Sequence, residues 1–419
     1  MNMSSSINEP REKNYMLVLP TNFVRRDGAL FIDQDFSENL QVFLDYFDTI
    51  SIYSHVSDPS EDGMLASVTP FSSIPNASRI DFVELPEPYR EDRYFLKRNE
   101  VAAKLQKGFD RAFVVQCTPH APFDWPTMAS SLLSKQKVPF AIQSDWDKWT
   151  TTKSIYTEVK GPLQKLRKYI HARLFLKNFR DILRNTSVAL LHGNDVYEGS
   201  KNLTPNPQLI HNPSVTAGDQ IDKQMLEVKK KSVRTGQPLQ ITYAGRTEPM
   251  KGPLEWLDVL SLLKDKGVEF EAVWFGTGSL EQQFLERLQQ LNLNTQVRYE
   301  GKVSREVIYD RLYGTDIFLF CHQTRESPRN LIEALACGAP IVGYSSPYAE
   351  DLTARYGGSV LHEVGNTAAV AKSIAGLDQD RERLSQTFES AAQSGKQYTR
   401  EGALAERAEL MIDYASIPR

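Results

Sequence analysis

The sequence has little cysteine and no pattern that would use it. Its 419 residues include only three cysteines, Cys117, Cys321 and Cys337. An odd, scattered set of this kind predicts neither a disulfide framework nor a zinc site, and it favours a reducing compartment. We therefore expect a cytoplasmic protein without disulfides.

Long apolar runs and a strong charge of either sign are also missing. No run approaches the roughly 18 apolar residues that would predict a membrane-spanning helix. Residues 1–14, MNMSSSINEPREKN, have no apolar core, so they predict a disordered lead and no signal peptide. The net charge of −4 and the pI near 6.1 do not favour nucleic acid as a partner.

What the chain does contain is an alternation of short apolar runs and longer amphipathic stretches. Buried strands of parallel sheets typically read as such β-branched runs, with helices between them. The fold class predicted is α/β. The expected strands are 15–20, 50–55, 112–117, 138–143 and 187–192, then 239–245, 270–276, 297–301, 316–321 and 339–344.

The two series of strands predict two doubly wound domains, at 15–213 and 238–397. Between them, residues 214–237 are polar and basic and are expected to form a linker. Residues 398–419 have the spacing of an amphipathic helix, which either caps the second domain or bridges back to the first. Ligands of such sheets bind at the carboxyl ends of the strands, so two facing domains would form a cleft.

The first stretch whose residues could take part in binding or catalysis is YAGRTEPMKGPLEWLDVL, at 243–260. A strand ends near Ala244 and a helix is expected to begin near Pro253. Arg246 and Lys251 lie between them, where two cations could neutralise a diphosphate. The alternative is that both are solvated loop residues.

The second stretch is VWFGTGSLEQQF, at 273–284, where a strand runs into Gly276-Thr277-Gly278 and then a helix. Glycines permit a close backbone approach, and a helix start favours an anionic or polar ligand. The third glycine of a dinucleotide fingerprint is absent, so this piece is a weak signal alone.

The third stretch joins a strand at 316–321 to a helix that ends near Gly338. Glu333 lies one turn into that helix and could accept two ribose hydroxyls, or it could simply favour the helix dipole. Glu326 lies in the loop and could bind sugar hydroxyls, or it could be a surface charge. The backbone amides expected to point out of the helix start belong to Ser327, Arg329, Asn330 and Leu331.

Taken together and in this order, these stretches resemble family 4 (group 1) retaining glycosyltransferases of the GT-B fold. The resemblance runs over about 239–414 and includes GRTEPMKG, WFGTGSLEQQF, ESPRNLIEALACGAPIVGY and HEVGNTAAVAKSIAGL. It implies two Rossmann-like domains facing across a cleft, the first on the acceptor side and the second binding a nucleotide sugar.

The resemblance also implies roles for individual residues. Arg246 and Lys251 would hold the nucleotide diphosphate, and Glu333 would bind the ribose. The piece EGKV at 300–303 looks like the loop whose backbone reads the base, which makes Val303 a donor-binding residue. Gly276 and Thr277 would line the same donor site.

One departure from the family concerns the two glutamates. The family places them eight positions apart, whereas Glu326 and Glu333 are seven apart. Without a gap, Arg325 takes the place of the sugar-binding glutamate; with a one-residue deletion, Glu326 takes it. We favour Glu326, because a cation facing the donor sugar would not accept its hydroxyls.

The first half resembles the family only loosely. Residues 15–47 take the place of its first strand, glycine-rich loop and helix, with the usual glycines reduced to Gly28. Residues 138–146 look like the strand that ends in His-Asp, which here reads Ser144 and Asp145. His120 is a candidate to line the cleft instead, although a lone loop histidine is commonly structural.

The implied activity is transfer of a sugar from a UDP-, GDP- or ADP-linked donor to a glycan, lipid-linked or small-molecule acceptor. Arg246, Lys251 and the helix-start amides could stabilise the departing diphosphate, so no metal or other cofactor is expected. The leaving phosphate could take the acceptor proton, and Asp145 is the alternative carboxylate. The competing hypothesis is a catalytically inactive module that binds a nucleotide sugar.

Residues 160–185 predict a basic amphipathic helix with eight lysines and arginines against one aspartate. Such helices can lie on anionic membranes, which would place the protein on the cytoplasmic membrane face. The alternatives are an ordinary surface helix with a solvated basic face, or a membrane-associated scaffold without nucleotide affinity.

Overall fold

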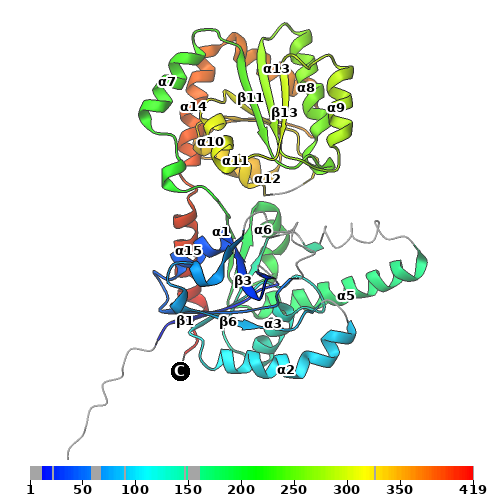
Figure 1. Ribbon diagram of the computed structural model, residues 1–419, viewed down its shortest axis with the longest axis vertical. Helices are drawn as coiled ribbons and strands as arrows, with labels where there is room; N and C mark the ends of the chain where they lie inside the picture. Colours follow the sequence, from blue (N-terminus) through cyan, green and yellow to red (C-terminus); the bar gives the residue numbers. More distant parts are fainter. Residues whose placement is uncertain are drawn as a thin grey trace, which may run out of the picture. The chain divides into compact units, whose positions relative to one another are not determined.

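The structure, a computed structural model, describes residues 12–20, 23–57, 68–88, 91–145, 148–149, 161–324 and 327–418. The chain divides into two compact units, Met1–Ile210 with Glu401–Arg419, and His211–Arg400. Each unit is built around its own parallel sheet (Figure 1). Within the described ranges, no helix combines the length and the apolar character needed to cross a membrane.

The first unit contains a seven-stranded sheet in the order β10-β9-β8-β7-β1-β4-β6, and all of its pairings are parallel. Parallel neighbours require crossover connections, and helices supply most of them. The strands are β1 (Asn14–Val18), β4 (Thr49–Ser54), β6 (Ile80–Glu84), β7 (Val114–Cys117), β8 (Ala141–Ser144), β9 (Val188–His192) and β10 (Pro207–Ile210).

Alternation along the strands buries both faces of this sheet. In β1, Tyr15 and Leu17 pack into one apolar cluster with α1 and α15, and Met16 and Val18 pack into another with α2, α3 and α5. The helices are α1 (Gln34–Phe43), α2 (Glu91–Phe109), α3 (Trp125–Gln136), α5 (Pro162–Asn185), α6 (Asn194–Ser200) and α15 (Arg400–Ala415). Residues 401–419, and so nearly all of α15, belong to this first unit.

A small antiparallel sheet interrupts the expected strand, glycine-rich loop and helix over 15–47. It consists of β2 (Phe23–Arg26), β3 (Ala29–Asp33) and β5 (Val68–Pro70). Asp27 and Gly28 form the two-residue hairpin turn, with φ of 49° and 80°. Two positive φ angles are typical of a type I′ turn, which explains the glycine. Gly28 therefore lies in a hairpin turn and not in a strand-to-helix loop.

The second unit contains a six-stranded parallel sheet in the order β13-β12-β11-β14-β15-β16, covered by helices and packed around one apolar core. The strands are β11 (Leu239–Ala244), β12 (Phe270–Phe275), β13 (Val297–Gly301), β14 (Ile317–Phe320), β15 (Ile341–Tyr344) and β16 (Ser359–His362). The helices are α7 (Lys223–Val233), α8 (Pro253–Asp265), α9 (Glu281–Gln290), α10 (Arg305–Tyr313), α11 (Arg329–Ala336), α12 (Pro347–Thr353), α13 (Thr367–Gln379) and α14 (Arg381–Gly395).

Every predicted strand overlaps an observed one, so the α/β class with two parallel sheets is confirmed. The strands β6, β10 and β16 were not predicted. Residues 214–237, expected as a linker, include helix α7, which packs against α14 in the second unit. The lead expected over 1–14 lies largely outside the described residues, and β1 begins at Asn14.

Candidate functional site

The loop after β11 carries the two predicted diphosphate ligands, Arg246 and Lys251. A short 3-10 turn at Pro249–Lys251 leads through Gly252 into α8. Gly252 has a φ of +63°, and a Cβ there would lie 2.0 Å from the carbonyl oxygen of Cys321. Only glycine satisfies both conditions, so the loop can rest directly on the end of β14.

These two cations differ in exposure. Arg246 is exposed, with a guanidinium nitrogen 3.9 Å from the sulfur of Met250. Lys251 is 8% exposed. Burial, and then the charge of Lys251, holds the pKa of His322 well below its usual value, and Nε2 of His322 lies 2.8 Å from the hydroxyl of Tyr243. The edge of the sheet thus offers one solvated and one nearly buried cation, a pair suited to an anionic ligand.

Thr247, which sequence reasoning missed, joins the loop after β11 to the loop after β12 and to strands β12 and β13. Its buried hydroxyl lies 3.0 Å from the indole nitrogen of Trp274, 3.1 Å from the hydroxyl of Tyr299 and 3.1 Å from the carbonyl oxygen of Gly276. Its amide donates to the carbonyl of Thr277 at 3.0 Å. The available signal was Trp274 in a buried strand, because a buried indole N–H needs an acceptor.

The glycines after β12 allow loop to pack on loop. A Cβ on Gly276, where φ is +120°, would lie 2.2 Å from the carbonyl oxygen of Gly245, and one on Gly278 would lie 2.5 Å from that of Thr247. The close approach expected of these glycines is therefore to neighbouring backbone. Thr277, between them, is exposed.

The start of α11 is tied to β11 through Asn330. Its side-chain amide donates to the carbonyl of Ala244 at 2.7 Å, and its Oδ1 is buried without a hydrogen-bond partner among the described residues. Leu331 is a core residue, whereas Arg329 is exposed and Ser327 is half-buried. These residues lie next to the loop that carries Arg246.

Arg325 and Glu326, the two candidates for the place of the sugar-binding glutamate, lie outside the described residues, which resume at Ser327. Glu333, the other carboxylate, is half-buried and accepts a hydrogen bond from the hydroxyl of Ser214 at 2.6 Å. Burial first, and then the charge of Glu333, raises the pKa of Tyr309 on α10. Glu333 therefore faces α10 and the chain segment before α7.

Val303 lies just after β13 and is half-buried. Strand β12, which pairs with β13, leads into the loop that contains Gly276. The backbone amide of Gly276 donates to the carbonyl of Gly301 at 2.6 Å. The loops after β11, β12, β13 and β14 thus form one edge of the second sheet, as expected for a parallel α/β ligand site.

In the first unit, Ser144 ends β8, Asp145 follows it directly, and His192 ends the neighbouring β9. Ser144 is buried. One carboxylate oxygen of Asp145 accepts from the side-chain nitrogen Nε2 of Gln143 at 3.0 Å and lies 3.9 Å from Nδ1 of His192. The carboxyl edge of this sheet therefore holds Asp145 between an amide donor and an imidazole.

A chain of side-chain amides, one buried and one half-buried, leads to that carboxylate. The hydroxyl of Tyr15 donates to Gln116 at 2.6 Å, Gln116 donates to Gln143 at 3.2 Å, and Gln143 donates to Asp145. An ionised carboxylate can only accept, so it sets the direction of every hydrogen bond behind it. Burial raises the pKa of Tyr15 well above its usual value, which keeps its hydroxyl protonated and able to donate.

His120 lies in the loop between β7 and α3, which Asp124 organises. The buried carboxylate of Asp124 accepts hydrogen bonds from the amides of His120 and Ala121, at 2.8 and 2.7 Å. Burial, and then the charge of Lys148, lowers the pKa of His120 to about 4. Burial lowers the pKa of Lys148 itself to about 8. His120 is thus neutral near pH 7.

The structure brings His120, Asp145 and Lys148 into electrostatic reach of one another, since the charge of Asp145 opposes part of the lowering of both pKa values. Gly28 is far from His120, Asp145 and Lys148 in the sequence, and it lies in the hairpin turn between β2 and β3. Asp145, Trp146 and Asp147 also form an Asp-x-Asp spacing after a strand, which the expectation of a metal-free reaction overlooked. Trp146 and Asp147 lie outside the described residues.

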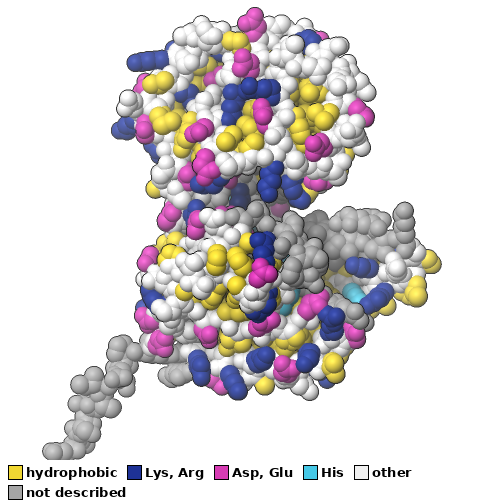
Figure 2. Space-filling view, in the orientation of Figure 1, with side chains coloured by type: hydrophobic (Ala, Val, Ile, Leu, Met, Phe, Trp, Pro, Cys, Tyr) yellow, Lys and Arg dark blue, Asp and Glu magenta, His cyan; other side chains and the backbone are white. Residues whose placement is uncertain are grey.

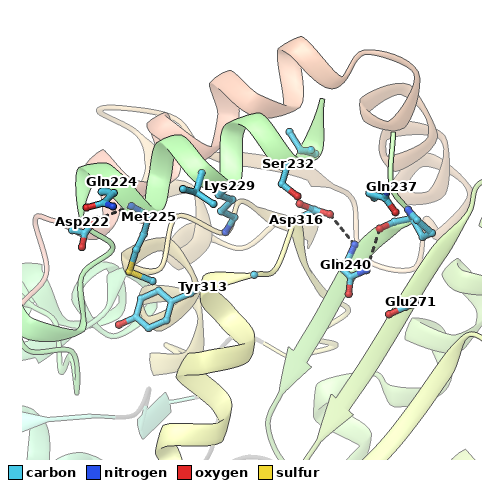
Figure 3. Close-up of a pocket in the computed structure, with 14 residues that line it drawn as sticks. Asp222, Gln224, Met225, Lys229, Ser232, Gln237, Gln240, Glu271, Tyr313 and Asp316 are labelled. Atoms are coloured by element: carbon cyan, nitrogen blue, oxygen red, sulfur yellow. Dashed lines mark hydrogen bonds between the residues drawn. The ribbon is translucent and has the colours of Figure 1, made fainter. Parts of the chain in front are cut away.

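A separate groove of about 640 Å³ lies at the opposite, amino-terminal edge of the second sheet (Figure 3). Several of its polar groups have partners within the chain: Lys229 donates to the carbonyl of Cys337 at 3.3 Å, and Asp316 accepts from the backbone amide of Gln240 at 2.9 Å. Arg311 donates to the side chain of Gln240 at 2.8 Å. The groove is therefore a structural hollow beside α7, away from the loops described above.

Comparison with known proteins finds a family model that matches part of the chain. Residues 224–394 match the family model described as "Glycosyl transferases group 1". The 2-deoxystreptamine N-acetyl-D-glucosaminyltransferase of Niallia circulans is 24% identical over 131 residues, which cover 31% of this chain and 34% of that enzyme's length. The aligned part thus spans about a third of that relative.

Solved structures resemble the chain over nearly its whole length. HepE of Anabaena, crystallised with UDP, has a TM-score of 0.66 and 13% identity, and covers 96% of this chain and all of that one. A glycosyltransferase of Rickettsia africae has a TM-score of 0.62 and 16% identity, covering 96% and 98%. The fold is therefore the GT-B fold of two Rossmann-like units.

Proposed function

We propose that this chain, whose second unit carries a group 1 glycosyl transferase domain, is a retaining glycosyltransferase that uses a nucleotide-sugar donor. The observation that carries the proposal is the edge of the second sheet. Arg246 and Lys251 follow β11, and Glu333 follows β14, which is paired with β11. Two cations and a carboxylate at neighbouring strand ends match the phosphates and the ribose of a nucleoside diphosphate.

In the proposed reaction, Arg246 and Lys251 stabilise the charge that develops on the departing diphosphate. Glu333 accepts ribose hydroxyls, and the backbone near Val303 reads the base. The amides of Ser327, Arg329 and Asn330 add positive potential at the start of α11. The sugar is attacked on the face from which the diphosphate leaves, and that diphosphate takes the acceptor proton.

Further ligands of the donor are proposed from the same edge. Gly276 and Thr277 line it through their backbone, and Leu331 supplies a helix-start amide. Glu326 is proposed to bind the donor sugar. UDP is the first nucleotide to test, because Anabaena HepE has been crystallised with UDP and with UDP-glucose.

On the acceptor side, we propose that Asp145 orients the acceptor hydroxyl, with His120 and Ser144 beside it, and that it is the alternative base if the diphosphate does not take the proton. The acceptor is a glycan, a lipid-linked sugar or a small molecule. No metal is proposed, but the Asp145-Trp146-Asp147 spacing makes this a point to test. Turnover that survives a chelator supports a metal-free reaction, and turnover restored only by Mg²⁺ or Mn²⁺ contradicts it.

The membrane surface is a proposed partner of α5. Its outward side chains alternate between apolar and basic, and Figure 2 shows hydrophobic side chains beside Lys and Arg at its outer end. The exposed apolar residues of α5 are Leu163, Leu166, Tyr169, Ile170 and Leu174. A cytoplasmic protein that binds reversibly to an anionic membrane face would use such a surface.

A thermal-shift screen with UDP, GDP, ADP and their sugars tests the donor proposal. A ligand of the native state raises the unfolding midpoint. Arg246→Ala is expected to weaken nucleotide affinity by about ten-fold or more, since hydrogen bonds between charged groups contribute roughly 1.5–3 kcal/mol. Arg298→Ala removes an exposed arginine on β13 and should leave affinity unchanged.

No stabilisation by any nucleotide would refute the proposed function. Binding without transfer or donor hydrolysis on a panel of acceptors would instead favour the inactive binding module. Vesicle binding without any nucleotide affinity would favour a membrane-associated scaffold.

A further inference from the structure

The carboxylate of Glu333 is held by a residue from outside the helices and strands. Ser214 lies between β10 and α7, and its hydroxyl donates a hydrogen bond to Oε1 of Glu333 at 2.6 Å. The two residues are 119 positions apart in the sequence, so no local pattern could have linked them. A hydroxyl–carboxylate bond of this length belongs to the strong, charge-assisted class.

The backbone of Ser214 is itself anchored by two arginines. Its carbonyl oxygen accepts from a guanidinium nitrogen of Arg305 at 3.1 Å and from one of Arg400 at 3.3 Å. The amide of Arg400 donates to the carbonyl of Val215 at 2.7 Å. Because Arg400 is only 9% exposed, this contact is shielded from competing water.

Arg305 is itself held by Asp219 and Tyr309. The guanidinium nitrogen that contacts Ser214 also lies 2.7 Å from a carboxylate oxygen of Asp219 and 3.1 Å from the hydroxyl of Tyr309. The guanidinium group also stacks over the Tyr309 ring, 4.3 Å from its centre. Asp219 also accepts from the amide and the hydroxyl of Thr216, both at 2.7 Å. Although burial opposes it, Arg305 and Thr216 lower the pKa of Asp219. The segment 214–219 is therefore pinned to α10 by an ionised carboxylate.

We infer that Ser214 is a positioning residue that sets the carboxylate of Glu333 for a nucleoside diphosphate. A glutamate has several rotatable bonds, and ordering such a side chain costs up to about 2 kcal/mol. A carboxylate has about four lone-pair sites, so a glutamate can accept a serine hydroxyl and ribose hydroxyls at the same time. The inference rests on the proposed function, because it assigns Glu333 to the ribose.

The test compares Ser214→Ala with the wild type for binding of UDP and 2′,3′-dideoxy-UDP by calorimetry. Loss of the hydroxyl should weaken the affinity for UDP by about ten-fold. The affinity for dideoxy-UDP should stay within about two-fold of the wild-type value, since only the ribose hydroxyls would contact Glu333. Ser214→Thr keeps a hydroxyl and should restore most of the affinity. In a Glu333→Ala background, Ser214→Ala should cause no further loss.

Ser232→Ala is the matched control, because Ser232 is an exposed serine on α7. Unchanged or tighter UDP binding by Ser214→Ala would overturn the inference, the latter by showing that Ser214 competes with the ribose. An equal loss for both nucleotides would also overturn it, since that marks a general structural defect. If the wild type binds none of UDP, GDP and ADP, the proposed function itself fails, and the inference fails with it.

Discussion

Single glycines decide how closely the ligand-binding loops pack. Gly252 and Gly267 both have positive φ angles, 63° and 75°. A Cβ on Gly252 would overlap the carbonyl oxygen of Cys321, whereas one on Gly267 would meet nothing within 4 Å. The two positions therefore separate the cost of backbone conformation from the cost of overlap.

We predict that Gly252→Ala lowers the free energy of unfolding by about 2–4 kcal/mol, from the left-handed backbone plus the overlap. Gly267→Ala, the control, should cost only about 1 kcal/mol. Denaturant unfolding of both variants measures the difference. Equal losses would show that the loop can move away from β14 without cost.

At the scale of elements, α5 combines two roles in one helix. Its second half packs into the first unit through Phe175, Phe179 and Ile182, while Leu166 and Ile170 in its first half are 55% and 47% exposed. A helix that were only a cover for the sheet would not present an apolar stripe to solvent. Basic residues beside the stripe favour an anionic surface.

We predict that vesicles containing anionic phospholipid bind the protein and that all-neutral vesicles bind it more weakly. Leu166→Ser with Ile170→Ser should weaken binding by at least about ten-fold, because each buried aliphatic side chain contributes roughly 1.5–3 kcal/mol. Val228→Ser changes an apolar residue on α7 that is 62% exposed and serves as the control. Co-sedimentation measures the effect, and equal binding by all variants would remove α5 from the proposal.

At the scale of the whole molecule, buried bases make stability depend on pH. Burial lowers the pKa of His55 to about 4, and burial with the charge of Lys148 lowers that of His120 to about 4. An unfolded histidine titrates near 6.5, so below that pH the unfolded state binds more protons than the folded state. Stability is therefore lost as the pH falls from about 6.5 to 4.

We predict that the thermal midpoint falls between pH 7 and pH 5, and that His55→Gln makes this fall shallower. The contribution of His55 is on the order of 3 kcal/mol over the full window. Scanning calorimetry at several pH values gives the measurement. A variant whose midpoint falls as steeply as that of the wild type would show that His55 does not titrate on unfolding.

Much of the architecture could be predicted because parallel sheets have a plain signature. Continuous apolar runs such as those ending at Ala244 and Phe320 are buried on both faces, so they read as strands without tertiary information. The hairpin around Gly28 was missed, since Asp-Gly was interpreted as part of a glycine-rich loop and not as a type I′ turn. Helix α7 was missed because its sequence is polar and its packing partner, α14, lies far along the chain.

The sequence by itself determined which residues stand at the ends of strands, because strand ends and glycines are local features. It could therefore nominate Arg246, Lys251 and Glu333 as candidate ligands. Only the tertiary structure decided what each of them touches: Lys251 is nearly buried, and Glu333 accepts a hydrogen bond from Ser214. Such contacts join residues far apart in the chain, and hydrogen bonds and burial depend on distance in space, which no local pattern records.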